Sequence, residues 1–309
     1  MTNQPLVLLG GTGFLGSTLC ELLTRHTGGA GPRIRVATRR LAHAHGVRSL
    51  PTVDVVQADV HDEEQLAQLL AGAGTVVNLV AVLHGSRATF ERVHVVLPRR
   101  LVAACRAAGV QRVLHVSALG VGEGAPSDYL RSKTTGEALL RDSGLAVTVL
   151  RPSVMFGAGD RFFNLFAKLQ QVLPVVPLGG SDALFQPVWV NDVAQALVRC
   201  LHDPTTIGQV YECAGPARVT LSEIVALAGR WSGHARPQLA LPAALARLQA
   251  RAMEMLPGEP LLSRDNLLSM QRPNVASGVL PGLRELGIEP TPMAAVVPGY
   301  LAPRRAIGG

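Results

Sequence analysis

The chain has 309 residues, of which 48% are hydrophobic and 17% charged, so it can fill about two globular domains and is not an intrinsically disordered protein. Its net charge of +7 comes almost entirely from arginines that are scattered rather than clustered. This pattern disfavours a nucleic-acid partner and leaves a phosphate-bearing ligand or an anionic membrane surface. The four cysteines have neither metal-ligand nor disulfide spacing, so we expect no metal site and a reducing compartment.

The termini and apolar runs predict neither a signal peptide nor a transmembrane segment. The N-terminus lacks a basic region followed by an apolar core. The longest apolar run, near residues 75–83, is far shorter than the roughly 20 residues that a membrane helix needs. We therefore expect a cytoplasmic protein.

Short apolar runs alternate with helical patterns through the first half of the chain. The apolar runs predict strands at residues 6–9, 34–37, 53–56, 75–80, 112–116 and 147–150. Helical patterns lie at residues 63–70, with Asp62 as N-cap, and at residues 97–108, ending at Gly109. This alternation predicts an α/β fold with a doubly wound parallel sheet, whose ligand lies at the carboxyl ends of the strands.

The first predicted strand runs into a glycine-rich turn. Gly10 permits a tight turn, Gly13 lets the backbone approach a pyrophosphate, and Gly16 lets the following helix pack closely on the strand. The start of that helix would present unpaired N–H groups to the phosphates. Because the turn follows a strand and begins a helix, it favours dinucleotide binding over an ordinary strand–helix turn. The residues of the turn expected at the cofactor are Gly10, Thr12, Gly13, Phe14, Leu15 and Gly16.

Beyond about residue 155 the regular alternation ends. The expected elements are a helix at 162–173, a strand at 184–190, a helix at 192–201 with Asp192 as N-cap, and a strand at 209–213. From Leu221 the pattern is mainly helical with proline breaks, and we expect disorder at residues 304–309. The sequence thus predicts a dinucleotide-binding domain at 1–155 and a smaller, mostly helical substrate lid at 156–309, with some segments returning to the sheet.

Three residues form a candidate catalytic group. Ser117 directly follows the fifth predicted strand, and the four-residue spacing of Tyr129 and Lys133 places both on one helix face. The Lys133 ammonium should lower the pKa of Tyr129 from its usual value of about 10 by stabilising the phenolate. Tyr129 would then exchange a proton with a substrate hydroxyl or carbonyl, while Ser117 hydrogen-bonds the same oxygen. The alternative is a packed surface tyrosine beside a solvated lysine.

The cofactor is indicated by the end of the second predicted strand, which carries Arg39 and Arg40 and no acidic residue. An acid at this place binds the ribose 2′-hydroxyl, whereas an arginine binds a 2′-phosphate. A guanidinium suits a phosphate because it forms bidentate, charge-assisted hydrogen bonds. The sequence therefore favours NADP(H), with NAD(H) as the alternative if these arginines are merely solvated.

These motifs resemble the extended, epimerase-like branch of the short-chain dehydrogenase/reductase superfamily. The resemblance extends from residue 6 to about residue 200 and implies a Rossmann fold with Ser117, Tyr129 and Lys133 as catalytic residues. His94 departs from the pattern of this branch, because extended relatives often carry asparagine near this position. Residues 115–119 and 129–137 are similar to bacterial relatives of the reductase-like accessory subunit of respiratory complex I. The resemblance also implies that the cofactor contacts Asp59, Val60, Ala81, Tyr129, Lys133, Pro152, Ser153 and Val154.

Two classes of function follow. The first is an NADP(H)-dependent oxidoreductase or epimerase-like enzyme for a small molecule that the lid sequence does not identify. The second is an NADPH-binding structural or redox-sensing subunit associated with a respiratory complex or quinone metabolism, with peripheral contact at the inner face of the membrane. The apolar, arginine-containing stretch at residues 239–256 would supply that contact, although core packing is its simplest interpretation.

Overall fold

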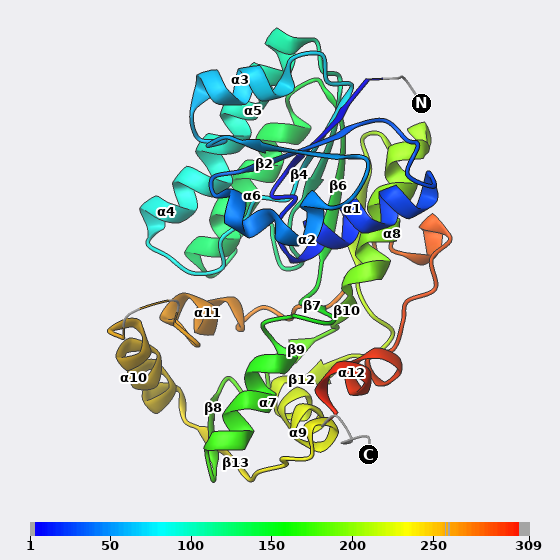
Figure 1. Cartoon of the computed structure of the whole chain (residues 1–309). Helices are drawn as coiled ribbons and strands as arrows, with labels where there is room; N and C mark the ends of the chain where they lie inside the picture. The colour runs from blue at the N-terminus through cyan, green and yellow to red at the C-terminus, as the bar shows by residue number, and fades with distance from the viewer. Residues whose placement is uncertain (1–3, 257, 259, 303–309) are drawn as a thin grey trace, which may run out of the picture.

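The computed structural model describes residues 4–256, 258 and 260–302, and its largest element is a seven-stranded sheet (Figure 1). All neighbouring strands of this sheet are parallel, in the order β11-β6-β5-β4-β1-β2-β3. They are β1 (Leu6–Leu9), β2 (Ile34–Thr38), β3 (Val53–Gln57), β4 (Thr75–Asn78), β5 (Arg112–Val116), β6 (Ala146–Pro152) and β11 (Val210–Cys213). The predicted α/β fold with a doubly wound parallel sheet is confirmed.

The strand order creates a switch point between β1 and β4. From β1 the chain moves outward to β2 and β3, then returns to the other side of β1 and continues through β4, β5 and β6. The loops that follow β1 and β4 therefore diverge and leave a crevice at the carboxyl edge of the sheet, where doubly wound folds bind their ligands.

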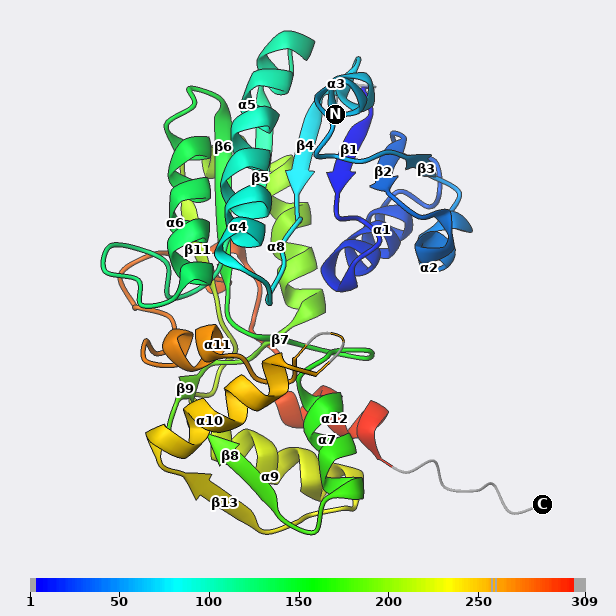
Figure 2. The same cartoon turned by 90° about the vertical axis from the view of Figure 1, so that its left-hand side faces the viewer.

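Helices cover both faces of the sheet (Figure 2). Leu6 and Leu8 of β1 pack toward the layer of α1, α2 and α8, whereas Val7 and Leu9 pack toward the layer of α3, α5 and α6. A short helix and a π-helical turn, α4 and η2, lead directly into α5. The bounds are α1 (Phe14–His26), η1 (Leu41–Ala44), α2 (His45–Arg48), α3 (Glu63–Leu70), α4 (Arg87–Glu91), η2 (Arg92–Val96), α5 (Leu97–Ala108), α6 (Asp128–Arg141) and α8 (Val190–His202).

The later part of the chain forms a smaller unit beyond the carboxyl edge of the sheet (Figure 1). Its core is formed by aromatic and branched side chains that include Phe156, Phe163 and Ile224. Its helices are α7 (Phe163–Val172), α9 (Leu221–Ser232), α10 (Ala243–Glu254), α11 (Arg264–Ser269) and α12 (Met293–Leu301). Three strand pairs support them: β7 (Met155–Phe156) with β10 (Val188–Trp189), β9 (Leu184–Phe185) with β12 (Val219–Thr220), and β8 (Val176–Gly179) with β13 (Gln238–Leu241).

Some segments of this later half lie with the first half of the chain, in and beside the main sheet. Strand β11 extends the main sheet beside β6, and α8 packs along α1. Of two single-turn 3-10 helices, η3 (Pro204–Thr206) joins α8 to β11, and η4 (Arg284–Leu286) lies between α11 and α12.

Three local predictions were wrong. The strand expected at 184–190 is two strands, β9 and β10, because Pro187 between them has no N–H for a ladder. Residues 238–241 form strand β13, and a helix begins only after Pro242. Asp192 is not the N-cap of α8, which is Trp189; its carboxylate instead accepts hydrogen bonds from the backbone N and Oγ1 of Thr291, at 2.8 and 3.0 Å. The tail expected to be disordered, 304–309, lies outside the described residues.

Candidate cofactor and catalytic site

The glycine turn after β1 has the geometry that its sequence predicted. Gly10 has a φ of +83°, a value that favours glycine, and its carbonyl accepts a 3.0 Å hydrogen bond from the N–H of Gly13. A Cβ atom on Gly16 would lie 2.4 Å from the Gly10 oxygen, so only glycine lets α1 start this close to β1. Gly13 is the N-cap of α1 and offers no side-chain acceptor, which leaves the first-turn N–H groups to face a ligand.

The other residues of the turn are partly exposed or buried beneath it. Thr12 and Phe14 are half-buried, and Leu15 is buried in the core between α1 and the sheet. The ring of Phe14 lies close to Gly157, the residue directly after β7. The turn therefore lies where the two parts of the molecule meet.

The residues expected at the adenosine end lie at the carboxyl ends of β2 and β3. Arg39 and Arg40 are exposed directly after β2, and Asp59 and Val60 are half-buried after β3. The Asp59 carboxylate accepts a 3.0 Å hydrogen bond from the N–H of His61. Because β2 and β3 are adjacent, these two loops are neighbours, and the arginines have no acidic residue beside them in the chain.

Ser117, at the end of β5, is buried and lacks a hydrogen-bond partner. Its side chain is 4% exposed, and its Oγ contacts no donor or acceptor among the residues that the structure describes. Lys133 lies beside this position, since its Nζ donates a 2.7 Å hydrogen bond to the carbonyl of Val116. A buried hydroxyl without a partner is costly, so it indicates a place where a bound molecule completes the hydrogen bonding.

Lys133 is itself buried, with 2% exposure, and burial lowers its pKa to about 8 against the opposing charge of Glu137. Glu137 is one turn further along α6 and forms a bidentate ion pair with Arg151 of β6, at 2.5 and 3.0 Å. This pair fixes α6 against the strand that ends at Pro152. Lys133 therefore lies on a helix that is attached to both β5 and β6.

Tyr129 lies one turn before Lys133, as predicted, but its pKa is not lowered. Burial first, and then the charge of Asp265, raise the pKa of Tyr129 to about 12. The ring makes edge contacts with Phe90 and His94, at centroid distances of 5.9 and 5.5 Å. The expectation that Lys133 dominates was wrong because the sequence showed neither this apolar surrounding nor a carboxylate from another part of the chain.

His94 lies in the π-helical turn η2, where it links two parts of the site. The Val82 N–H donates to its Nε2 at 3.2 Å, and its Nδ1 lies 2.9 Å from the Ser132 Oγ. Because Nε2 must accept, the proton is assigned to Nδ1. Burial and the charge of Lys133 lower the pKa of His94 to about 3, so the ring is neutral. His94 thus connects the loop containing Ala81, which is exposed after β4, to the helix containing Tyr129.

The strand end expected near a nicotinamide is fixed by a residue that the sequence did not indicate. The side-chain oxygen of Asn274 accepts from the Ser153 Oγ at 2.6 Å and from the Val154 N–H at 3.0 Å. Pro152 and Ser153 are buried, and Val154 is half-buried. Asn274 lies 120 residues further along the chain from Val154, so no local pattern could reveal this contact. His115, interpreted as a packed strand residue, is buried against Asn78.

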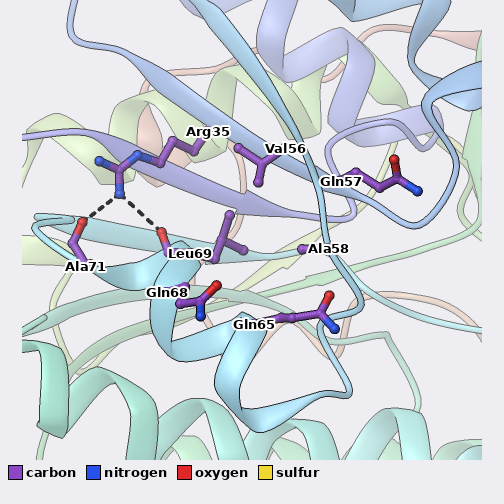
Figure 3. Close-up of a pocket in the computed structure, with 8 residues that line it drawn as sticks. All are labelled: Arg35, Val56, Gln57, Ala58, Gln65, Gln68, Leu69 and Ala71. Carbon is purple, nitrogen blue, oxygen red and sulfur yellow. Dashed lines mark hydrogen bonds between the residues drawn. The ribbon is translucent and has the colours of Figure 1, made fainter.

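The open pocket in Figure 3 is a different place. It has a volume of about 260 Å³ and lies beside β3 and α3, where Arg35 donates to the carbonyls of Leu69 and Ala71 at 3.2 and 2.6 Å. None of the residues predicted for the cofactor or for catalysis lines it. Its lining is Arg35, Val56, Gln57, Ala58, Gln65, Gln68, Leu69 and Ala71.

Two further classes of site were compared with the structure. Within residues 4–256, 258 and 260–302, no group of three His, Cys, Asp or Glu side chains is placed to hold a metal ion. Over the same residues, no helix is both long and apolar enough to cross a membrane. The candidate site consists of the glycine turn, the Ser117–Tyr129–Lys133 group and the loops between them.

The chain is similar to known proteins in sequence and in fold. The model of the NAD dependent epimerase/dehydratase family matches residues 6–214. Subunit 9 of the mitochondrial NADH dehydrogenase (ubiquinone) 1 alpha subcomplex of Mus musculus is 30% identical over 93% of this chain and 76% of that protein. A ceramide reductase from Caulobacter vibrioides is 30% identical over 64% of this chain and 61% of that protein. A dTDP-glucose 4,6-dehydratase from Streptomyces venezuelae, solved with NAD and TYD bound, has the same fold, with a TM-score of 0.74, 21% identity, and coverage of 96% of this chain and 95% of that one.

Proposed function

The chain belongs to the NAD dependent epimerase/dehydratase family, within the extended short-chain dehydrogenase/reductases, and from this membership we propose that it is an NADP(H)-binding oxidoreductase or epimerase-like enzyme. The observation that carries the proposal is the unpartnered, buried Ser117 Oγ next to the Lys133–Val116 contact, at the carboxyl edge of the sheet. A site of this kind lacks one hydrogen-bonding group, which a substrate oxygen would supply.

The residues present fit a dinucleotide. The uncapped start of α1 and the tight Gly10–Gly16 turn would hold the pyrophosphate. Asp59 and Val60 would border the adenine, Ala81 the middle of the cofactor, and the Pro152–Val154 strand end the nicotinamide. Bound there, the nicotinamide would supply or accept a hydride. We also propose that residues 1–155 are the cofactor domain and that residues 156–309 are the substrate lid, with α8 and β11 as the parts that rejoin the first domain.

Each catalytic side chain then has a separate role. Ser117 orients the substrate oxygen through its hydroxyl. Tyr129 transfers a proton at its phenolic oxygen, and Lys133 binds the cofactor ribose and holds positive charge one helical turn away. Since the pKa of Tyr129 is raised to about 12, the phenol carries at neutral pH the proton that it would transfer.

We propose NADP(H) rather than NAD(H) as the cofactor. Arg39 and Arg40 are both exposed at the end of β2, the place that reads the ribose, and the chain has no acid there to bind a 2′-hydroxyl. Native mass spectrometry of the protein as purified would test the proposal, because it reports cofactor and substrate together. We expect a bound NADP species or, after stripping, restored binding on adding NADPH. A protein that binds neither NADPH nor NADH would contradict it.

A second function, an NADPH-binding subunit of a respiratory complex or of quinone metabolism, is favoured by one surface feature. Helix α10 exposes Leu245 and Leu248, at 50% and 63%, and its C-cap Met255, at 81% exposure, continues this stripe, while Ala246 and Ala250 face inward. Arg247 and Arg251 flank the stripe and are exposed. An exposed apolar stripe with arginines beside it is typical of helices that lie on an anionic membrane surface. The mouse relative is named as a subunit of NADH dehydrogenase, which agrees with such a role.

A further inference from the structure

The lid contacts the catalytic helix directly at its N-terminus. Asp265, in the first turn of α11, accepts a 2.7 Å hydrogen bond from the N–H of Asp128 on one carboxylate oxygen and a 3.1 Å hydrogen bond from the N–H of Tyr129 on the other. Ser269, one turn later, donates from its Oγ to the Oγ of Ser127, the N-cap of α6, at 2.8 Å. Figure 2 shows α11 beneath this end of α6.

The contact continues along residues 263–274, which we name the α11 segment. Arg272 donates to the carbonyls of Gly120 and Glu123, both at 2.9 Å, in the loop between β5 and α6. Asn274 then accepts from Ser153 and Val154 at the end of β6. The α11 segment therefore spans the candidate site, from the helix that carries Tyr129 to the strand end expected at the nicotinamide.

The carboxylate of Asp265 lies at the N-terminus of α6, beside the backbone of Tyr129. Tyr129 lies in the first turn of α6, where the positive end of the helix dipole would otherwise stabilise a phenolate. Asp265 places a carboxylate on the N–H of that same residue and offsets the dipole. Of the other groups that face Tyr129, Lys133 loses its charge near pH 8, below the range in which Tyr129 ionises. His94 is neutral, and Asp128 is paired with Arg131 at 2.7 Å.

We propose that Asp265 is a positioning residue that joins the lid to the catalytic helix and disfavours the Tyr129 phenolate while the α11 segment is docked. The inference rests on the proposed function and deepens it by coupling the lid to the catalytic tyrosine. The raised pKa of Tyr129, which has burial as its first cause and Asp265 as its second, agrees with this geometry.

In the reductive direction, the Tyr129 phenol would give its proton to a substrate carbonyl oxygen, and a bound reduced nicotinamide would supply the hydride to the carbonyl carbon. The products would be an alcohol and the oxidised dinucleotide, and the Tyr129 phenolate would recover its proton from solvent. Withdrawal of the α11 segment, as substrate enters or product leaves, removes the carboxylate from α6 and eases ionisation of Tyr129.

The test is the titration of Tyr129 in the full chain labelled with ¹³C at the tyrosine Cζ. The chain has three tyrosines, so Tyr129→Phe assigns the resonance. Asp265→Asn keeps one hydrogen-bond acceptor but removes the charge. Asp142→Asn is the matched control, because Asp142 is the exposed C-cap at the other end of α6. We expect Asp265→Asn to ionise Tyr129 between pH 10 and about 12, where the parent and Asp142→Asn remain protonated.

An unchanged Tyr129 titration in Asp265→Asn, with the other two tyrosine resonances as in the parent, would overturn the inference. If that variant does not fold, Ser269→Ala serves instead, since it weakens the docking of α11 without touching a charge, and an unchanged titration there would also count against us. NADPH binding is measured in parallel and should survive in both variants. Loss of binding in the parent would refute the proposed function, whereas a shifted titration would still support the coupling of Asp265 to Tyr129.

Discussion

The Nζ of Lys133 donates a 2.7 Å hydrogen bond to the carbonyl oxygen of Val116, the residue that ends β5 immediately before Ser117. This contact attaches α6 to the strand end that is followed by Ser117. It also buries an ammonium group, because Lys133 is 2% exposed and has no carboxylate as a direct hydrogen-bond partner among the described residues. The lysine is therefore held in the site at a cost in stability.

That cost predicts a specific pH dependence. The pKa of Lys133 is lowered from 10.5 to about 8 in the folded protein, so the unfolded chain binds more protons between these values and stability should rise with pH across them. Below about pH 8 both states are charged and the penalty is constant. Relative to Lys133→Met, the parent should gain roughly 2–3 kcal/mol from pH 8 to 10, measured by urea unfolding. A difference between the two proteins that does not vary with pH would contradict this.

The parts of the site that sequence could predict are those encoded locally. The Gly10–Gly16 turn was predictable because its three functions depend on residues within one strand–helix unit, and the structure confirms the positive φ of Gly10 and the close approach at Gly16. The Tyr129 and Lys133 pair was predictable because helical spacing fixes their shared face. The alternation of strands and helices predicted the parallel sheet because each strand–helix unit is also a local pattern.

What sequence could not predict depends on residues far apart in the chain. Asp265 meets Tyr129 across 136 positions and Asn274 meets Val154 across 120, and neither has a local signal. Burial, and then the charge of Asp265, reversed the expected shift in the pKa of Tyr129. Asp192 was misassigned for a related reason: an acid at a helix start resembles an N-cap, but here the partner of its carboxylate is Thr291, 99 positions away.

The glycine turn gives a direct test of packing. Gly16→Ala should destabilise the protein by about 1–3 kcal/mol and weaken dinucleotide binding, because its Cβ would lie 2.4 Å from the Gly10 carbonyl oxygen. Gly46→Ala, in α2, is the control, since nothing lies within 4 Å of its Cβ and its φ is not positive. Gly46→Ala should leave the free energy of unfolding unchanged or raise it by about 0.5–1 kcal/mol. Thermal unfolding and NADPH titration measure both effects.

Cofactor choice should depend on Arg39. Replacing it with aspartate removes a charge-assisted contact with the 2′-phosphate and adds repulsion, so NADPH affinity should fall by roughly 1–3 kcal/mol while NADH affinity changes little. Arg230→Asp, an equally exposed arginine on α9 of the lid, controls for the change in net charge. Calorimetry on the parent and on the two variants measures the affinity of each protein for NADPH and NADH. Equal affinity of the parent for both dinucleotides would show that the β2 end does not read the phosphate.

Tyr129→Phe tests the catalytic role once a substrate is known. The substitution removes only the hydroxyl, so the ring contacts with Phe90 and His94 should remain, and the fold and NADPH affinity should be unchanged. Turnover should fall by about 10² or more, since the transferable proton is lost. Tyr300→Phe is a control that removes a hydroxyl in the lid, where the phenol donates to Asp160 at 2.5 Å. Unchanged turnover in Tyr129→Phe would place the acid at another residue.

The stripe on α10 makes a prediction that separates a free enzyme from a membrane-associated subunit. The protein should bind vesicles that contain anionic lipid more strongly than neutral vesicles, and Leu248→Glu should abolish that binding by placing a charge in the stripe. Val279→Glu, at a residue that is 87% exposed outside the stripe, should have no effect.

Raising salt from 0.1 to 1 M shortens the Debye length from about 10 to about 3 Å, so the contribution of Arg247 and Arg251 should be lost while apolar contact persists. We therefore expect partial release of the protein from the vesicles as salt is raised, measured by sedimenting the vesicles at each salt concentration. A protein that remains in the supernatant with anionic vesicles at low salt would remove the support for a membrane-bound role.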